Sequence, residues 1–141
     1  MIEECMLLAN ECAADLLNNR YGYAPFRIHE EPDKLKLETL KKILGGNVQL
    51  QNPQDPASQI NSISKKISAK DQLKQSLILQ TMKRAEYSTE NVGHFGLQLD
   101  QYCHFTSPIR RYPDLLTHRM IKSCIEDDDD YYSVCKNIEK D

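Results

Sequence analysis

The sequence predicts an α+β fold that is predominantly helical, and three observations lead to this prediction. Apolar and small residues recur at helical spacing over residues 2–17. Several later segments repeat this spacing and are bounded by capping aspartates, prolines or glycines. Only short segments have the alternating pattern of a strand. The chain of 141 residues has the length of one domain and can bury a hydrophobic core.

The first predicted helix carries its apolar stripe at residues 2, 5, 6, 9, 12, 13, 16 and 17. Cys5 and Cys12 are seven residues apart on this stripe, where a thiol usually acts as a small buried hydrophobe. No Ser, Thr, Asp or Asn precedes the stripe to cap the helix, so we expect the chain to begin inside a longer protein. The five cysteines form no Cys-x-x-C pair, which argues against a zinc ribbon or a secreted disulfide scaffold and favours the reducing cytoplasm.

The next elements follow in order. FRIHE (26–30) predicts a short strand. Asp33 caps a predicted helix that ends at Gly45-Gly46 and carries Leu37, Leu40 and Leu44. Residues 47–57 are a predicted loop, because they contain two prolines. A short helix is then predicted from Ile60, Ile63 and Ile67.

The second half of the chain continues this pattern. Asp71 opens a predicted helix that ends near Tyr87, and FGLQL (95–99) is a predicted strand. Pro113 begins a last helix, which runs through Leu116, Met120, Ile121 and Cys124. Residues 126–141 start with EDDDD and predict an acidic, solvated tail.

Charge and hydropathy limit the possible partners. No run of about 18 apolar residues occurs, so we expect no segment that spans a membrane. The net charge of −3 is unevenly distributed, since residues 65–84 hold six bases and only one acid. A polyanionic partner therefore stays possible in spite of the negative total. The sequence specifies no oligomeric state.

The segment HFTSPIRRYPD (104–114) places two arginines between two prolines. Thr106 and Ser107 can accept hydrogen bonds from the N–H groups of the following turn, and Pro108 suits the first position of a helical turn. Such a turn offers free N–H groups and a positive partial charge to an anion.

Arg110 and Arg111 add formal charge beside this turn. A guanidinium is a planar fork that can hold a phosphate through two hydrogen bonds. These features together predict a rigid phosphate clamp. The alternative is two surface arginines at a helix start, one of which pairs with Asp114.

Three stretches of this sequence resemble the catalytic (RNB) domain of the ribonuclease II and ribonuclease R exoribonucleases. They are HFTSPIRRYPDLLTHR (104–119), GHFGLQLDQY (93–102) and MIEECMLLANECAA (1–14). Within that family the sequence most resembles ribonuclease R. The resemblance covers residues 1–125 and implies that they are the C-terminal portion of such a domain, while 126–141 lie outside it.

The resemblance implies a processive enzyme that degrades single-stranded RNA from its 3′ end and releases nucleoside 5′-monophosphates, with Mg²⁺ as cofactor. In the family, four aspartates hold the metal and position the attacking water. Their motif precedes everything in this chain, so we expect no metal ligands here. The missing upstream half of the catalytic domain is then a partner, and the isolated chain is expected to be inactive.

The resemblance also implies roles for individual residues. Arg110 matches the arginine that holds RNA phosphate near the scissile bond, which makes it the catalytic candidate. Arg111 lies where relatives also carry a base. Glu3 matches a glutamate that contacts the terminal nucleotides, with Glu4 as the alternative if the register is off by one. The remaining predicted RNA contacts are Thr106 and Ser107.

Several residues of the sequence also allow other interpretations. Tyr102, Phe105 and Tyr112 can stack on bases, although packing is the more usual use of such side chains. His94, His104 and His118 with Asp100 and Asp114 fit no metal template. The chain can instead be a non-catalytic nucleic-acid-binding module that uses the arginines and the lysines of 65–84, or a structural remnant without a ligand. If the missing part of the domain supplies most of the sheet, we expect the apolar surface that it should cover to be exposed.

Overall fold

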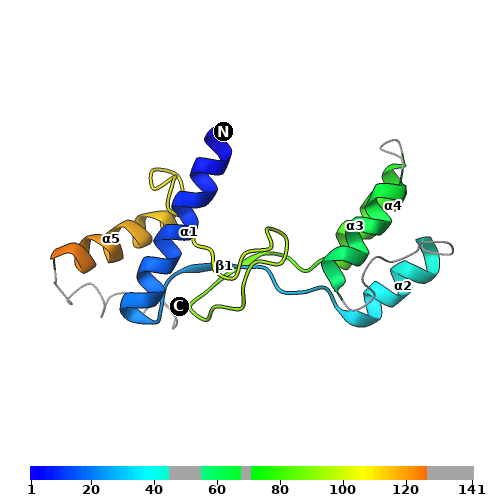
Figure 1. Ribbon diagram of the computed structural model, residues 1–141, viewed down its shortest axis with the longest axis horizontal. Coiled ribbons are helices and arrows are strands. Elements are labelled where there is room, and N and C mark those ends of the chain that lie inside the picture. The colour runs from blue at the N-terminus through cyan, green and yellow to red at the C-terminus, as the bar shows by residue number, and fades with distance from the viewer. Residues whose placement is uncertain (45–54, 68–70, 127–141) are drawn as a thin grey trace. The chain divides into compact units, whose positions relative to one another are not determined.

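A computed structural model describes residues 1–44, 55–67 and 71–126 (Figure 1). Over these residues the chain forms five helices and one two-stranded antiparallel sheet, which confirms the predominantly helical α+β fold. It divides into two compact units. The first unit combines residues 1–29 with the described residues from 85 onward, and the second unit is residues 30–84. No helix in the described ranges has the length and apolar character needed to cross a membrane.

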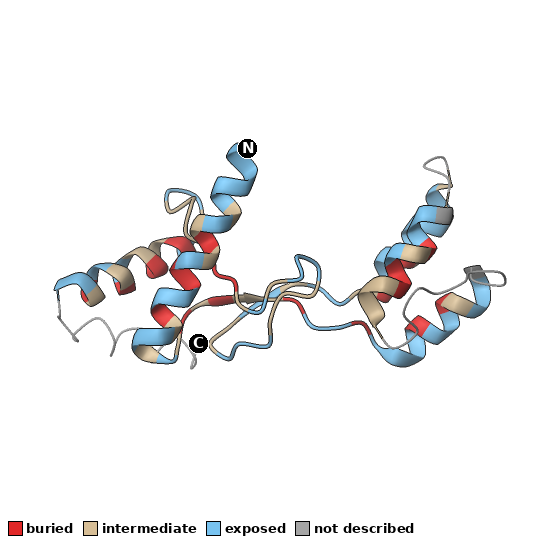
Figure 2. Cartoon of the chain, in the orientation of Figure 1, coloured by how far each residue is buried: buried red, intermediate tan, exposed pale blue. Residues whose placement is uncertain are grey.

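Helix α1 (Ile2–Tyr21) confirms the first predicted helix. It ends at Gly22, which has φ 67° and donates its N–H to the carbonyl oxygen of Asn18 at 2.8 Å. Glycine adopts this left-handed conformation at little cost. Figure 2 shows that the first turns of α1 are exposed and that its buried residues begin midway along the helix. The exposed apolar surface that the sequence predicts is found here, at Ile2, Met6 and Leu8.

The buried face of α1 is rotated from the predicted stripe. It consists of Asn10, Ala13, Ala14 and Leu17. Cys5 and Cys12 are exposed, so the burial predicted for these two thiols is wrong. Residues 5 and 12 lie on the far side of the helix from the face that meets the core, because each residue turns the helix by about 100°.

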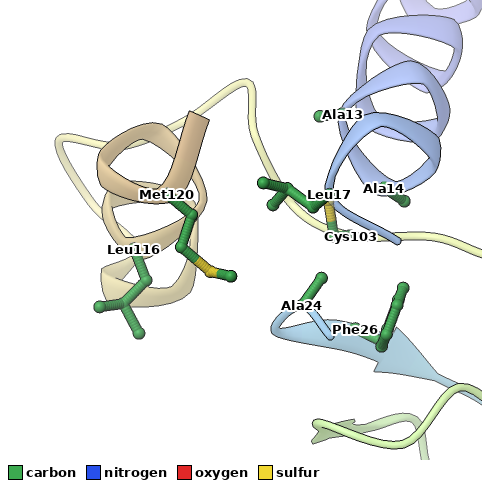
Figure 3. Packing of buried hydrophobic residues seen from close by; sticks show 8 residues of the cluster. All are labelled: Ala13, Ala14, Leu17, Ala24, Phe26, Cys103, Leu116 and Met120. Carbon is green, nitrogen blue, oxygen red and sulfur yellow. The ribbon is translucent and has the colours of Figure 1, made fainter. Parts of the chain in front are cut away.

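The core of the first unit joins α1, the β1 strand (Phe26–Ile28), the segment around Cys103 and helix α5 (Tyr112–Glu126). Figure 3 shows its eight side chains, from Ala13, Ala14, Leu17, Ala24, Phe26, Cys103, Leu116 and Met120. Burial of a side chain such as Leu17 or Phe26 contributes about 1.5–3 kcal/mol. This core fixes the two helices that carry the candidate site.

Strand β1 confirms the strand predicted from FRIHE. It pairs antiparallel with β2 (Glu86–Ser88), so that Phe26 lies opposite Ser88 and Ile28 opposite Glu86. The helix predicted to run from Asp71 to near Tyr87 is therefore too long. Helix α4 (Gln72–Thr81) ends earlier, because the following residues leave it to pair with β1.

The strand predicted for FGLQL (95–99) is wrong, because these residues form a turn. The N–H of His94 donates to the carbonyl oxygen of Leu99 at 2.8 Å, and Gln98 has φ 56°, which breaks an extended path. Gly96 donates its N–H to Nδ1 of His29 at 3.0 Å. A Cβ on Gly96 would lie 2.6 Å from that nitrogen, so only glycine permits this approach.

The second unit consists of α2 (Lys34–Leu44), α3 (Pro56–Lys66) and α4. The predicted caps are confirmed, since Asp33 accepts from the N–H of Leu35 at 3.0 Å and Asp71 from that of Lys74 at 3.4 Å. Helix α3 begins at Pro56, inside the predicted loop, because Asp55 caps it. The apolar interior includes Leu37, Leu40, Ile60, Ile63 and Ile78. Gly45-Gly46 and residues 127–141 of the predicted tail lie outside the described residues.

Candidate functional site

The arginine segment forms one tight turn before helix α5. The N–H groups of Arg110 and Arg111 both donate to the carbonyl oxygen of Ser107, at 3.3 Å and 3.2 Å. Pro108 lies in this turn, and the helix itself starts at Tyr112, with Pro113 as its second residue. The last predicted helix is thus confirmed, and a single hydrogen-bonded turn precedes it.

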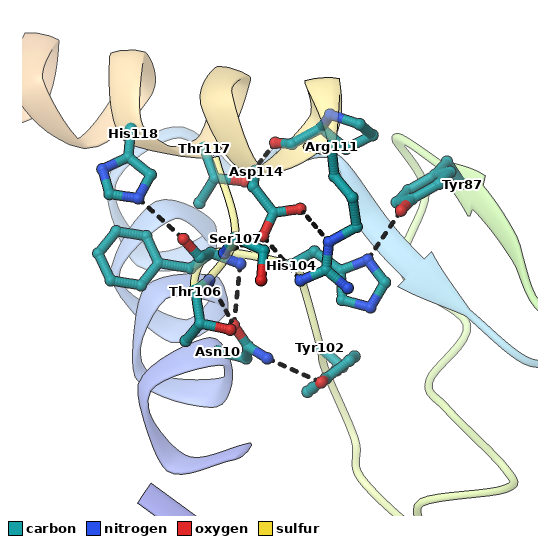
Figure 4. Close-up of polar contacts among 12 residues, drawn as sticks. Asn10, Tyr87, Tyr102, His104, Thr106, Ser107, Arg111, Asp114, Thr117 and His118 are labelled. Atoms are coloured by element: carbon teal, nitrogen blue, oxygen red, sulfur yellow. Dashed lines mark hydrogen bonds and ion pairs between the residues drawn. The ribbon is translucent and has the colours of Figure 1, made fainter. Parts of the chain in front are cut away.

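Asp114 holds this turn from the side of α5. Its side chain is fully buried. Oδ1 accepts the N–H of Ser107 at 2.7 Å and Nη2 of Arg111 at 2.8 Å, while Nε of Arg111 lies 2.8 Å from Oδ2 (Figure 4). A buried carboxylate needs such a partner, because its unpaired charge would be costly. Arg111 therefore pairs with Asp114. This agrees with the alternative prediction, in which one of the two arginines forms such a pair.

Asn10 holds the same segment from the side of α1. Its Oδ1 accepts the N–H of Phe105 at 2.8 Å and that of Thr106 at 3.2 Å. Its Nδ2 donates to Oη of Tyr102 at 2.8 Å. Asn10 was not among the site residues predicted from the sequence. A signal was present, because position 10 shares a helical face with residues 13, 14 and 17, where a buried polar side chain requires hydrogen-bond partners.

The hydrogen bonds differ from those predicted for Thr106 and Ser107. The backbone carbonyl of Ser107 accepts the N–H groups of the turn. The backbone N–H groups of Phe105, Thr106 and Ser107 all donate to buried side chains, so an anion cannot use them. Oγ1 of Thr106 is buried and has no partner among the described residues. An anion at this turn would depend mainly on a guanidinium group.

Arg110 differs from its neighbour Arg111. It is exposed, and its guanidinium makes no ion pair or hydrogen bond with any residue that the structure describes. Ile109 beside it is fully exposed, which places the tip of the turn in solvent. Of the two arginines, Arg110 is the one whose guanidinium is available to a ligand.

The other predicted contact residues lie in different surroundings. Glu3 is exposed in the first turn of α1, and no hydrogen bond joins it to the arginine turn within the described ranges. Tyr102 is buried, and the ring of Phe105 stacks on that of His118 with centroids 4.1 Å apart. Tyr112 is 57% exposed. Two of the three aromatic residues therefore serve packing, and Tyr112 keeps a surface for stacking.

The histidines of the site have structural partners. Nδ1 of His104 lies 2.7 Å from Oη of Tyr87, and burial, helped by the charge of Arg111, lowers the pKa of His104 to about 4. Burial, with His29 next, also lowers the pKa of His94. Nε2 of His118 donates to the carbonyl oxygen of Phe105 at 2.8 Å. Burial raises the pKa of the Cys103 thiol to about 12, so this thiol stays protonated and is no nucleophile.

The described residues do not fit a magnesium site. Among them, no group of three His, Cys, Asp or Glu side chains is arranged to hold a metal ion. The one buried carboxylate of the site, that of Asp114, is already engaged by Arg111 and by a backbone N–H. The site therefore offers charge and hydrogen bonds to an anion, and no step through a metal follows from it.

This chain is similar in sequence and in fold to known proteins. The family model described as the RNB domain matches residues 1–127. Ribonuclease R of Vibrio parahaemolyticus is 43% identical over 129 residues, which are 89% of this chain and 15% of that protein. The structure of Mycoplasma genitalium RNase R in complex with ribose-methylated single-stranded RNA superposes with a TM-score of 0.73 at 35% identity, over 86% of this chain and 20% of that one.

A further similar structure is that of yeast Ssd1, described as a pseudonuclease. It matches with a TM-score of 0.70 at 30% identity, over 89% of this chain and 16% of that one. The chain thus spans no more than about a fifth of the length of these three proteins. Because the family model covers nearly the whole chain, this chain belongs to the RNB-domain family and is similar to ribonuclease R.

Proposed function

We propose that this chain is part of a processive 3′-to-5′ exoribonuclease that hydrolyses single-stranded RNA to nucleoside 5′-monophosphates, and that it supplies contacts to RNA phosphate. One observation carries the proposal. Arg110 presents an exposed guanidinium without a partner in the described residues, at the tip of a turn that two helices hold. Membership of the RNB-domain family and a relative bound to RNA support RNA as the anion.

Arg110 can act on a phosphate in two ways. Its planar fork can donate two hydrogen bonds to one phosphate group, and it stays charged at any working pH. If the bound phosphate is the one that reacts, the same charge stabilises the negative charge that develops as the bond breaks. Arg111 is engaged by Asp114, so its contact with RNA stays a prediction, as do those of Glu3, Thr106 and Ser107.

The proposed division of labour follows from the resemblance to the family, in which the metal-binding aspartates lie in a motif upstream of the arginine segment. We propose that Mg²⁺ and its aspartates belong to an upstream part of the catalytic domain, outside this chain. The isolated chain would then bind RNA weakly and release no mononucleotides. Progressive release of mononucleotides by the purified wild-type chain, lost in Arg110→Ala, would contradict this part of the proposal.

The binding test uses fluorescence anisotropy of a labelled single-stranded RNA at several salt concentrations. We expect Arg110→Ala to weaken binding about tenfold, because it removes a charge-assisted hydrogen bond. The slope of log K against log salt should fall by about 0.7, the value for one phosphate contact on a single strand. The matched control is Arg119→Ala, since Arg119 is an exposed arginine of α5. Equal weakening by both substitutions would refute a specific contact at Arg110.

A non-catalytic nucleic-acid-binding module is the second candidate function. The observation that favours it is the similarity to yeast Ssd1, which is described as a pseudonuclease. The two candidates make the same prediction for Arg110→Ala. They differ in what they predict for the sequence upstream of this chain. An aspartate-rich metal motif there would support the enzyme, and the absence of such a motif would support the binding module.

A further inference from the structure

We propose that Asn10 is a positioning residue for Arg110, so that a buried amide on α1 controls how the arginine turn meets RNA phosphate. The inference rests on the proposed function, because it assumes that Arg110 contacts RNA. It concerns a residue that touches neither the RNA nor the guanidinium. Its evidence is that Asn10 of α1 binds the backbone of residues 105 and 106, which lead directly into the arginine turn (Figure 4).

Hydrogen bonds hold consecutive backbone groups from residue 105 to the arginine turn. Asn10 accepts the N–H groups of Phe105 and Thr106, and Asp114 accepts that of the next residue, Ser107. The carbonyl oxygen of Ser107 then accepts the N–H of Arg110. Three consecutive N–H groups are thus held by buried side chains of two different helices, immediately before the turn. The position of the turn follows from where these two side chains lie.

The Asn10 side chain is itself fixed. It is 4% exposed and lies on the helical face of Ala13 and Ala14, which belong to the core. Its amide has one orientation that satisfies its neighbours, because only Oδ1 can accept two N–H groups while Nδ2 donates to Oη of Tyr102. The carbonyl oxygen of Asn10 also lies 3.6 Å from Sγ of Cys103. The acceptor therefore has a defined place relative to the core.

Arg110 depends on this backbone more than its neighbour does. The guanidinium of Arg111 is held directly by Asp114. That of Arg110 has no such contact with the described residues, so its starting position is set by the backbone of the turn. Loss of the acceptor at Asn10 would leave two N–H groups to find water, and the turn would open. A misplaced guanidinium binds phosphate less well, because bidentate contact requires a defined geometry.

The test compares a substitution of Asn10 with a substitution of Tyr102, the residue that accepts a hydrogen bond from the Asn10 amide. Asn10→Ala removes the acceptor, and we expect RNA affinity to fall about tenfold, toward that of Arg110→Ala. Tyr102→Phe removes the hydroxyl partner but leaves Oδ1 in place, and we expect a smaller loss of affinity than in Asn10→Ala. Both substitutions disturb the same buried network, so a general loss of stability would weaken binding in both. Circular dichroism confirms that each variant is folded at the assay temperature.

Two further variants are measured in the same RNA-binding assay. Asn10→Asp keeps an acceptor for both N–H groups, and we expect it to restore most of the affinity. The double variant Asn10→Ala with Arg110→Ala should bind no more weakly than Arg110→Ala alone, because both changes act on one contact. Additive losses, or equal losses in Asn10→Ala and Tyr102→Phe, would overturn the positioning role.

The inference can fail separately from the proposed function. If Arg110→Ala leaves RNA affinity unchanged, the proposed function itself is wrong. If Arg110→Ala weakens binding while Asn10→Ala does not, the positioning role alone is wrong. A measurement on the wild-type chain covers the case in which Asn10→Ala does not fold. The side-chain amide signal of Asn10 should then shift when RNA is added, but not in Arg110→Ala, and an unchanged wild-type signal would contradict the inference.

Discussion

Asp114 gives two adjacent arginines different roles. Its buried carboxylate takes the guanidinium of Arg111 into a partly buried ion pair, in which Nη2 and Nε both lie 2.8 Å from carboxylate oxygens. Arg110 is one residue earlier, and its side chain is exposed. In the sequence, Arg110 and Arg111 are simply two adjacent positive charges. In the structure, Arg111 binds Asp114 and helps to hold the turn, whereas Arg110 is available to a ligand.

His104 gives a prediction for the pH dependence of stability. Its pKa is about 4 in the folded chain and about 6.5 without the fold. Between these values the unfolded chain binds a proton that the folded chain does not, so stability falls as the pH decreases from 6.5 toward 4. Above pH 6.5 this contribution does not change. We expect His104→Gln to lose less stability than the wild type between pH 7 and pH 4.5, measured by urea unfolding.

A direct measurement checks the cause of that difference. The imidazole signal of His104 should titrate well below pH 6.5 in nuclear magnetic resonance spectra of the folded chain. His94 also has a lowered pKa, so the comparison between wild type and variant isolates the share of His104. A titration midpoint near 6.5, or equal pH dependence in both proteins, would contradict the prediction.

The turn at 94–99 shows how an element depends on a distant neighbour. Its letters FGLQL suit a strand, but the N–H of Gly96 is bound to Nδ1 of His29, which lies 67 residues away in the sequence. The ring of His29 also packs edge-on against His94 and Phe95. The close approach of backbone and imidazole, together with the positive φ of Gln98, replaces extended pairing.

Gly96→Ala tests this arrangement. The new Cβ would lie 2.6 Å from Nδ1 of His29, so the turn or the ring must move and the hydrogen bond is lost. We expect the free energy of unfolding to fall by about 1–3 kcal/mol, the usual cost of overpacking. Urea unfolding measures this change. The control is Leu97→Ala in the same turn, which removes an exposed side chain and should have a small effect.

The chain as a whole consists of two compact units. Strands β1 and β2 pair with each other, although residues 30–84 lie between them in the sequence. Both strands of the sheet therefore belong to the first unit. The candidate site, including Asn10, Arg110 and Asp114, lies wholly in the first unit.

A deletion tests whether the first unit is sufficient. Joining His29 to Ala85 through Asn-Gly removes residues 30–84 and closes the Ile28–Glu86 pairing with a short loop. We expect near-ultraviolet circular dichroism to show a folded first unit. Total RNA affinity should fall, because the basic residues of 65–84 are lost. Arg110→Ala should still weaken binding by the same factor in the shortened chain, and loss of that effect would contradict a self-contained site.

Local patterns were sufficient for much of the fold. The first helix, the aspartate caps at positions 33 and 71, the strand at 26–28 and the last helix are encoded by residues within one or two turns of each other. The SPIRRYPD motif also indicated the arginine site and the family to which the chain belongs. The sequence was less informative where the outcome depends on contacts far along the chain. Strand β2, the turn at Gly96 and the exposure of Cys5 and Cys12 are of this kind.

The sequence by itself determined where the helices capped by Asp33 and Asp71 start, which family the chain resembles and which segment carries the candidate charge. Only the tertiary structure decided that Arg111 pairs with Asp114, that Arg110 is left available, and that Asn10 holds the turn from α1. The physical reason is one of range. Caps and helical periodicity act between near neighbours, whereas the partner of a buried polar group is chosen by packing between elements, here across more than ninety residues of sequence.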